Sequence, residues 1–571
     1  MKKVLSYIKG YGKESVLGPL FKMLEACFEL IVPFVIASII DTGIPNGDAP
    51  YILKMGAILI ALGVIGLASS VTAQFFAAKA AIGLATKLRR AVFAHIQKLG
   101  YAELDRVGVS TLLTRMTSDI NQVQAGVNLF LRLFLRSPFI VFGAMVMVFT
   151  LNTQLALVFV AAITILFVIV FGIMRITNPK YQALQKNLDS VTAATRENLN
   201  GVRVIRAFGR EETQVAEFAE INEKLADSQL RVGKISAMLN PLTYVVVNSA
   251  IIAVLWMGAG KVEGGVLLRG DLVAMINYIG QILIELVKLA NLVVLLSKAL
   301  ASLGRVEQIL DTESSMTFEG TQTGTEDDTI LKFQNVALQY QGAGAESVSD
   351  VSFALKKGQT LGIIGGTGSG KSSLVSLIPR FYDATEGTVF LKGVPIEDLR
   401  EDVLRKTVAV VQQKAQLFAG TIRSNLLWGN ENATDEELWQ ALETAQAAEF
   451  AREKGLDAPV EQGGRNLSGG QKQRLTIARA LVGKPEILIL DDSASALDYA
   501  TDAALRASLR KLPGNMSVVI VSQRTASIQH ADQILVLEDG QVEGMGKHQD
   551  LLDTCPVYRE IYESQFRKEE A

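Results

Sequence analysis

The sequence predicts a membrane-embedded, all-α domain with six transmembrane helices, joined to a soluble α/β domain. Three observations support this fold class. The first half of the chain carries six long apolar stretches, the second half begins with the alternating apolar residues of a strand, and a polar stretch rich in Thr and Gly separates them. We therefore expect a transmembrane domain over residues 1–311, a linker over 312–329 and an α/β domain over 330–571.

The six apolar stretches are long enough, with one exception, to cross a bilayer. A membrane-spanning helix needs about 20 mostly apolar residues. The third stretch reaches that length only if it begins near Val127, which places Arg132 and Arg136 near one membrane interface. Core helices of a soluble protein are the alternative, and six runs of this length disfavour it. The stretches are 16–40, 53–78, 134–150, 154–175, 240–260 and 271–298.

The charges of the connecting loops predict the orientation of the helices. Lys and Arg are frequent in the long connections 79–126 and 176–238 and are absent from 41–50 and 151–153. Because positive loops stay on the cytoplasmic side, we expect both long connections and the α/β domain in the cytoplasm. This predicts a multi-pass protein of a cell membrane, such as a bacterial plasma membrane. A net charge of −2 argues against a nucleic-acid partner.

A glycine-rich turn follows an apolar strand near the start of the α/β domain. Glycine permits positive φ angles and lets backbone N–H groups approach a phosphate closely, and the N-terminus of the following helix attracts the same anion. Lys371 is expected to reach the β- and γ-phosphates of a nucleotide, and the Ser372 hydroxyl to coordinate Mg²⁺. This P-loop comprises Gly365, Gly366, Thr367, Gly368, Ser369, Gly370, Lys371 and Ser372.

Two further motifs follow the P-loop in the chain. Ser468, Gly469, Gly470 and Gln471 form a second glycine-rich turn before a helix, which predicts a second anion-binding N-terminus. Farther on, an apolar strand ends in Asp491, whose carboxylate can hold a Mg²⁺ shell. An aspartate at the end of an apolar run is common by itself, so its significance depends on the neighbouring motifs.

In this order and spacing, the motifs resemble those of type IV ABC exporter half-transporters, which combine six membrane helices with one nucleotide-binding domain. The resemblance covers essentially the whole chain and implies ATP and Mg²⁺ as cofactors. It implies that Tyr340 stacks on adenine and that Gln413 ligates Mg²⁺, although such residues alone more often pack on a sheet or face solvent. The implied nucleotide contacts are Tyr340, the P-loop through Ser373, Ser468 to Gln471 and Asp498, and the implied metal ligands are Ser372, Gln413 and Asp491.

The chain departs from the family pattern at two positions. Asp492 stands where the family has a catalytic glutamate, and Gln523 stands where it has a switch histidine. An aspartate is one methylene shorter, which places its carboxylate roughly an ångström farther from the attacking water that a general base must reach. Glutamine cannot carry the charge or move the proton of an imidazole, and His530 lies seven residues too far along the chain.

These departures resemble the degenerate subunit of heterodimeric multidrug ABC exporters. In that family the signature of one subunit, here Leu467 to Gln471, closes on the P-loop of the other. The resemblance therefore implies a second half-transporter as partner, slow hydrolysis at this chain's own P-loop, and faster hydrolysis at the site that its signature completes. A slow homodimeric exporter and an ATP-binding regulatory membrane protein are the alternatives.

The membrane domain gives weaker information on the transported substrate. The family implies an amphipathic small molecule, peptide or lipid. Glu25 and Glu29 lie one helical turn apart, and ionisable groups at membrane depth are functional candidates. Surplus carboxylates would suit cationic substrates, whereas a pair between Glu285 and Lys288 would be structural, and we favour the structural interpretation. In the cytoplasmic connections, 104–106 and 200–208 resemble the coupling-helix regions of the family.

Overall fold

The computed structural model describes residues 7–325, 327–493, 495–512 and 516–566. It divides into two compact units. The first runs to Gln97 and continues from Val109 to Thr312. The second joins the short segment Lys98–Gly108 to the chain from Glu313 onward. Part of the first long connection therefore belongs structurally to the α/β unit.

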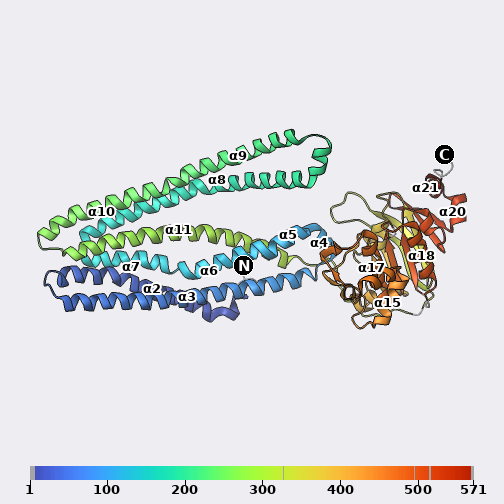
Figure 1. Cartoon of the computed structure of the whole chain (residues 1–571), viewed down its shortest axis with the longest axis horizontal. Coiled ribbons are helices and arrows are strands. Elements are labelled where there is room, and N and C mark those ends of the chain that lie inside the picture. Colours follow the sequence, from blue (N-terminus) through green and yellow to red (C-terminus); the bar gives the residue numbers. More distant parts are fainter. Residues whose placement is uncertain (1–6, 326, 494, 513–515, 567–571) are drawn as a thin grey trace. The chain divides into compact units, whose positions relative to one another are not determined.

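The first unit is built from long helices that lie side by side (Figure 1). Among the described residues, six helical segments are long and apolar enough to cross a membrane, which confirms the six expected spans. A 3-10 turn at Tyr7–Tyr11 precedes the first helix, and π-helical turns occupy Ile39–Gly43 and Arg115–Asp119. The helices are α2 (Gly12–Ser38), α3 (Ala49–Ile96), α5 (Val109–Thr114), α6 (Ile120–Leu133), α7 (Arg136–Leu151), α8 (Thr153–Ala207), α9 (Glu211–Ala237), α10 (Leu239–Glu263) and α11 (Arg269–Asp311).

Several helices are longer than a bilayer requires. α8 has 55 residues, which at 1.5 Å per residue makes it about 80 Å long. The hydrocarbon core of a bilayer is only about 30 Å thick. α8 and α9 run side by side as an extended hairpin (Figure 1), so the second long connection is helical, as its mixture of apolar and charged positions predicts.

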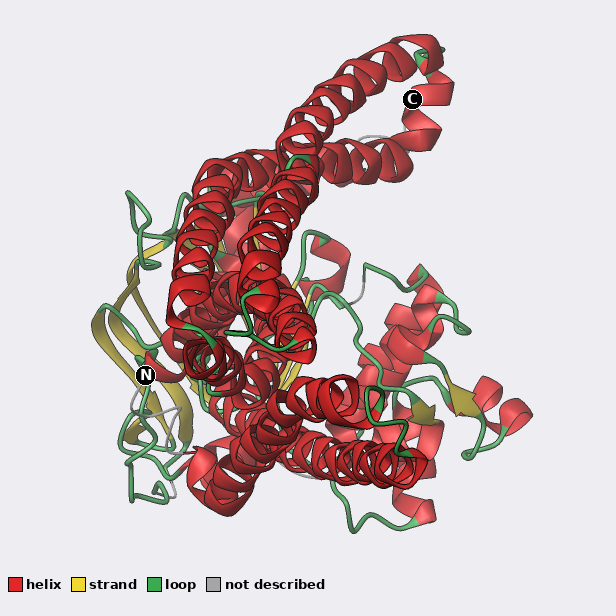
Figure 2. Ribbon diagram, turned by 90° about the vertical axis from the view of Figure 1, so that its left-hand side faces the viewer, coloured by secondary structure: helices red, strands yellow, loops and turns green. Residues whose placement is uncertain are grey.

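The strands belong to the second unit within the described part of the chain (Figure 2). The main sheet has the order β12-β11-β3-β10-β9-β6, in which β12 alone pairs antiparallel. Its strands are β3 (Thr360–Gly365), β6 (Val408–Val411), β9 (Ile487–Asp491), β10 (Ser517–Val521), β11 (Gln533–Glu538) and β12 (Gln541–Gly546). A second sheet contains β1 (Thr329–Leu338), β2 (Val348–Lys356), β4 (Glu386–Leu391) and β5 (Val394–Pro395), and a short pair contains β7 (Gly420–Thr421) and β8 (Pro459–Val460).

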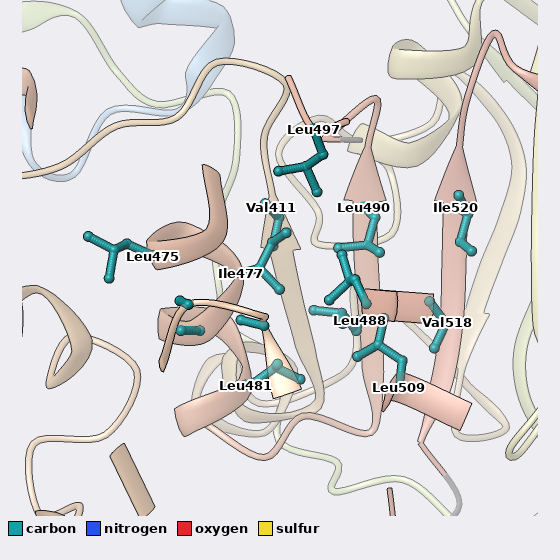
Figure 3. Packing of buried hydrophobic residues seen from close by; sticks show 14 of the residues in the cluster. Val411, Leu475, Ile477, Leu481, Leu488, Leu490, Leu497, Leu509, Val518 and Ile520 are labelled. Atoms are coloured by element: carbon teal, nitrogen blue, oxygen red, sulfur yellow. The ribbon is translucent and has the colours of Figure 1, made fainter. Parts of the chain in front are cut away.

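The central strands β3, β9 and β10 of the main sheet are buried on both faces, which explains why they are largely apolar, whereas the edge strand β12 is not buried. Successive residues of β9 alternate between two cores: Leu488 packs in one and Ile489 in the other. On the first face, α17 packs against β6, and its Ile477 lies beside Val411 (Figure 3). The helices are α4 (Tyr101–Val107), α12 (Lys371–Ser376), α13 (Glu401–Thr407), α14 (Ile422–Leu426), α15 (Asp435–Thr444), α16 (Ala448–Lys454), α17 (Gly469–Val482), α18 (Tyr499–Arg510), α19 (Thr525–Ile528), α20 (His548–Thr554) and α21 (Pro556–Phe566), and a 3-10 turn occupies Gln462–Gly464.

The short helix α4 is held against the second unit by aromatic and polar contacts. The ring of Tyr101 lies 4.4 Å from that of Phe381, centroid to centroid. The hydroxyl of Tyr382 donates a hydrogen bond to Asp105, and the Ser314 hydroxyl accepts one from the Gly100 amide at 3.1 Å. Tyr382 thus connects the cytoplasmic segment between the second and third spans to the α/β fold.

Candidate functional site

Most of the polar residues singled out in the sequence meet at the carboxyl ends of the parallel strands. β3, β6, β9 and β10 all end at the same edge of the sheet, which is where open α/β sheets bind their ligands. A cavity of about 640 Å³ lies there. It is lined by residues 345–347, the P-loop from Thr367 to Ser373, Gln413, Asp491, Asp492, residues 521–523, Asp539 and Gly540.

The shape of the P-loop depends on its glycines. Gly370, with φ of +89°, forms the left-handed turn that begins α12, a conformation that disfavours any side chain. A Cβ on Gly365 would collide with the Leu537 carbonyl oxygen. By contrast, a Cβ on Gly366 or Gly368 would meet no atom within 4 Å, so open space lies beside the loop on that side. That space is where backbone N–H groups can receive phosphate oxygens.

Lys371 lies across the mouth of this loop. Its ammonium donates hydrogen bonds to the carbonyl oxygens of Gly365 at 2.9 Å and Gly366 at 2.5 Å. Burial lowers the pKa of Lys371, and the carboxylates of Asp492 and Asp491 oppose that change. A partly buried ammonium that faces two carboxylates can exchange its carbonyl partners for the oxygens of a phosphate.

Asp491 and Ser372 form a pair of hard oxygen ligands. The Ser372 hydroxyl donates a hydrogen bond to the Asp491 carboxylate at 3.2 Å. Burial raises the pKa of Asp491, and the charge of Asp492 raises it further, against the opposing effects of Ser372 and Lys371. Oxygen ligands with unbalanced negative charge suit Mg²⁺, so this donor set fits the metal that the P-loop chemistry requires.

Asp492 adopts an unusual backbone conformation next to this pair. Its φ is +44°, in the left-handed region, and its amide donates to the Val521 carbonyl oxygen at 3.0 Å. Its carboxylate accepts a hydrogen bond from the side-chain amide of Gln413 at 3.1 Å. Burial raises the pKa of Asp492, while the bond from Gln413 and the charges of Arg524 and Lys371 lower it. Gln413, which is expected to ligate Mg²⁺, is thus hydrogen-bonded to Asp492, which occupies the position of the general base.

Tyr340 and Gln523 occupy two sides of the site. Gln523 lines the cavity directly. Tyr340 lies beside it, where its hydroxyl donates to the Ser373 hydroxyl at 3.1 Å and its ring packs edge-on against Tyr382 at 5.0 Å. The exposed part of the Tyr340 ring can receive a planar group, and its neighbour Tyr382 is one of the residues that hold α4.

The second glycine-rich turn and Asp498 lie elsewhere in the described structure. Ser468 caps α17: its hydroxyl accepts from the Gln471 amide at 3.3 Å, and the Gln471 side chain accepts from the Ser468 amide at 3.0 Å. Asp498 caps α18 by accepting from the Thr501 amide at 2.8 Å. Neither turn belongs to the described lining of the cavity. The P-loop site of one chain therefore lacks part of the predicted motif set.

Several residues of the site do not follow from the motifs. Asp539 and Gly540 come directly after β11. No motif marks them, but a search for polar residues at the ends of apolar strands would have found them. Ser347 precedes β2 in a loop, and no pattern of residue types indicates its role in the lining.

Comparison with known proteins identifies the family. Residues 15–286 match the family described as ABC transporter transmembrane region, and residues 348–495 match the family described as ABC transporter. Together the two matches cover more than half of the chain. The chain belongs to the ABC transporter family. It is a half-transporter of the type IV exporter class, with six membrane helices and one cytoplasmic nucleotide-binding domain.

Relatives and one solved structure align over nearly the full length of this transporter. The uncharacterized ABC transporter ATP-binding protein YfiB of Bacillus subtilis is 35% identical over 100% of this chain and 99% of its own length. The ATP-dependent lipid A-core flippase of Chromobacterium violaceum is 28% identical over 100% of this chain and 98% of its own. A bacterial Atm1-family ABC exporter with ATP bound has the same fold, with a TM-score of 0.79, 24% identity and 98% of each chain covered.

The transporter carries a second cluster of charges inside its membrane domain. The side chain of Arg136 is buried within the helical bundle, 7% exposed. Its guanidinium contacts Glu285 of α11 at 2.6 Å and Glu29 of α2 at 2.6 Å. Carboxylates of two other helices thus compensate the charge of Arg136 within the bundle.

The charges of this membrane cluster balance. The expected pair between Glu285 and Lys288 is confirmed, with 2.7 Å between the charged atoms, and the Ser137 hydroxyl donates to the same carboxylate. Lys22 pairs with Glu25 at 2.5 Å. Three carboxylates thus face three cations: Glu25, Glu29 and Glu285 against Lys22, Arg136 and Lys288.

Proposed function

We propose that this ABC transporter works as one half of a heterodimer with a second half-transporter. ATP-driven export is the activity of the exporter family to which the chain belongs. In the proposal, the chain holds ATP at its own P-loop and hydrolyses it slowly, and it contributes residues 467–471 to a faster site on the partner. Export of the substrate is driven mainly by that second site.

The observation that carries this proposal is the state of the Asp492 carboxylate. A general base must lie within hydrogen-bonding distance of the water it activates. Here the base position holds the shorter aspartate, and Gln413 engages its carboxylate at 3.1 Å. Gln523, which has no titrating imidazole, lines the same cavity. The site retains what is needed to bind a nucleotide and lacks the groups that accelerate its hydrolysis.

The position of the second glycine-rich turn supports the need for another chain. Ser468 and Gly469 are exposed at the N-terminus of α17, and a Cβ on Gly469 would meet no atom within 4 Å. An exposed helix N-terminus with an open face can receive an anion. The turn is capped and preformed, so we expect it to bind the γ-phosphate of a nucleotide held by the P-loop of the partner.

The nucleotide is proposed to bind with Mg²⁺. The P-loop amides and Lys371 would hold the phosphates, Tyr340 would stack on adenine, and Asp498 would contact the partner side of the closed dimer. Ser372 and Asp491 would hold Mg²⁺, with Gln413 joining them once it releases Asp492. When bound, the metal would neutralise negative charge on the phosphates and on the neighbouring carboxylates of Asp491 and Asp492.

The proposed substrate is an amphipathic small molecule, peptide or lipid, which includes the substrates of multidrug exporters. The balanced membrane cluster leaves no surplus carboxylate within it to select cations. A relative that is 28% identical over the whole chain is described as a lipid A-core flippase. The first observation disfavours selection of cationic substrates by this cluster, and the second supports a lipid as one candidate among amphipathic substrates.

The decisive experiment compares the isolated chain with the co-purified pair. General bases contribute about 10²–10⁴-fold to rates, so we expect the ATPase activity of the isolated chain to be at least about a hundredfold below that of the pair. Asp492→Asn in this chain should leave the activity of the pair within about twofold of wild type. A homodimer with the turnover of the pair, abolished by Asp492→Asn, would refute the proposal.

A second variant tests the shared site. Ser468→Arg places a long cation in the exposed turn and should abolish most ATPase activity of the pair, while ATP binding to this chain's own P-loop is retained. Gln462→Arg, at another exposed position just before the turn, is the matched control and should leave activity unchanged. If Ser468→Arg retained the ATPase activity of the Gln462→Arg control, the shared-site geometry would be contradicted.

A further inference from the structure

The last helix of the nucleotide-binding domain contacts the segment that follows β10. The side chain of Gln565 in α21 uses both ends of its carboxamide. Its nitrogen donates to the carbonyl oxygen of Gln523 at 2.7 Å. Its oxygen accepts from the amide and from the hydroxyl of Thr525, both at 2.9 Å. One side chain therefore bonds to the backbone on both sides of Arg524.

α21 is itself firmly held on the domain. Tyr558 is fully buried, and its hydroxyl lies 2.7 Å from Nδ1 of His548 in α20. Val557 and Ile561 pack against the core that contains the main sheet. The helix that carries Gln565 can therefore act as a fixed support for the segment 522–525.

The supported segment connects two parts of the nucleotide site. Gln523 lines the cavity beside the P-loop. The guanidinium of Arg524 lies 4.8 Å from the centroid of the Tyr499 ring at the start of α18, and its charge acts on Asp492. Thr525 begins α19 and is buried. The backbone that Gln565 holds thus places Gln523 in the lining of the nucleotide cavity and Arg524 beside Tyr499 at the start of α18.

We propose that Gln565 is a positioning residue that holds the 522–525 segment against the nucleotide cavity and thereby slows release of nucleotide from this site. The inference rests on the proposed function, because retention matters most where hydrolysis is slow. Gln523 lacks the charge that would attract it to a γ-phosphate, so its place in the cavity depends on its backbone. Gln565 fixes this backbone from outside the site.

The chemistry of the carboxamide makes the role specific. A glutamine both donates and accepts, whereas a glutamate only accepts. Gln565→Glu can keep the bonds from Thr525 and loses the bond to the Gln523 carbonyl oxygen. Gln565→Ala loses all of them. Ser564 is the matched control, because its hydroxyl donates to the Ile561 carbonyl oxygen of its own helix at 2.8 Å.

Two measurements on the full-length chain, co-purified with its partner, test the proposal. Hydrogen exchange of the Thr525 amide reports the contact itself. Release of a non-hydrolysable ATP analogue from this chain's P-loop reports its consequence and does not depend on which site hydrolyses ATP. Because a single hydrogen bond is typically worth a few-fold to about tenfold in an equilibrium, Gln565→Ala should raise both rates by about three- to tenfold.

The controls divide the outcomes. Ser564→Ala should leave both rates unchanged, and Gln565→Glu should accelerate release while the Thr525 amide stays protected. Unchanged exchange in Gln565→Ala would show that the contact is not formed in solution. Faster exchange with unchanged release would show that the contact is structural only. Either result overturns the proposal, whereas failure of the heterodimer hypothesis would be seen in the ATPase rate of the isolated wild-type chain.

Discussion

Two carboxylate clusters within the described residues, one in each unit, differ in how their charge is compensated. In the membrane domain, Glu29 and Glu285 both contact Arg136 at 2.6 Å. In the nucleotide-binding domain, Asp491 and Asp492 are adjacent, and the pKa of each is raised by burial. The carboxylates of the first cluster form direct ion pairs with cations of the chain. Within the described residues, those of the second accept hydrogen bonds from Ser372 and Gln413, and the charges of Lys371 and Arg524 act on them without a direct ion pair.

This difference separates a structural site from a ligand site. Charges taken out of water must be paired, and a group that is paired by the fold itself has no need of a ligand. Sequence alone presents both clusters as acidic groups in apolar surroundings. Their partners decide the function: α7 carries a guanidinium to the membrane carboxylates, whereas the ends of β9 and β10 leave Asp491 and Asp492 beside an open cavity.

The strongest test of the comparison removes the central cation of the membrane cluster. Arg136→Ala leaves Glu285, whose side chain is only 3% exposed, without its main partner. Loss of one member of a buried pair costs about 3–5 kcal/mol, so we expect this variant to lose most of its stability in thermal unfolding of the detergent-solubilised protein. Arg196→Ala, at an exposed position of α8, is the control.

A double variant distinguishes charge from packing in the same cluster. Arg136→Met combined with Glu285→Met removes both charges and retains much of the volume, so it should be less destabilised than Arg136→Ala. If the double variant is equally unstable, the cost does not come from an unpaired Glu285 charge, and the ion pair itself stabilises the contact between these helices.

In the nucleotide site, removal of a charge is expected to raise the stability of the protein and not to lower it. Asp491 has a raised pKa, so the folded protein binds its proton more tightly than the unfolded chain does. This carboxylate therefore lowers the stability as pH rises above about 4, the ordinary aspartate value, and its full cost is reached above the raised pKa. Asp491→Asn should raise the Tm of the nucleotide-free protein at pH 7 by about 2–4 °C, the effect of about 1 kcal/mol in a domain of this size.

The pH dependence and the response to magnesium provide the controls. Near pH 4 the Tm of Asp491→Asn and wild type should coincide. Addition of Mg²⁺ and ATP should stabilise the wild type and have a much smaller effect on Asp491→Asn. A variant that is less stable than wild type at every pH would show that the Asp491 charge is already compensated within the chain.

The smallest effect is expected at the edge of the membrane cluster. The side chain of Lys288 is 40% exposed. When Lys288 is removed, the Glu285 carboxylate keeps its contacts with Arg136 and Ser137. Partly exposed ion pairs contribute about 0–1 kcal/mol, so Lys288→Ala should unfold within a few degrees of wild type. A loss comparable to that of Arg136→Ala would mean that the balance of charge, and not the central guanidinium, stabilises the cluster.

Local patterns predict the architecture well because each depends on neighbouring residues. Twenty-residue apolar stretches predict the six spans, and the apolar strand before Gly365 predicts the position of the P-loop at the end of β3. The Glu285–Lys288 pair is predictable for the same reason, since its members are three residues apart.

The contacts that sequence patterns miss join distant residues. Arg136 and Glu285 are 149 positions apart, and Gln565 lies 42 positions from the carbonyl group that it holds. The bond between Gln413 and Asp492 joins two motifs that each suggest a separate role. These pairings depend on which helices and strand ends become neighbours, which no local spacing encodes.

The position of α4 has a practical consequence for work on the isolated cytoplasmic domain. A protein expressed from residue 313 onward would lack Tyr101, which normally covers Phe381, and Asp105, which binds the Tyr382 hydroxyl. Its surface would carry a bare aromatic patch next to Tyr340. We expect such a fragment to be prone to self-association and to be improved by a synthetic peptide of residues 98–108, which would offer the patch its native cover.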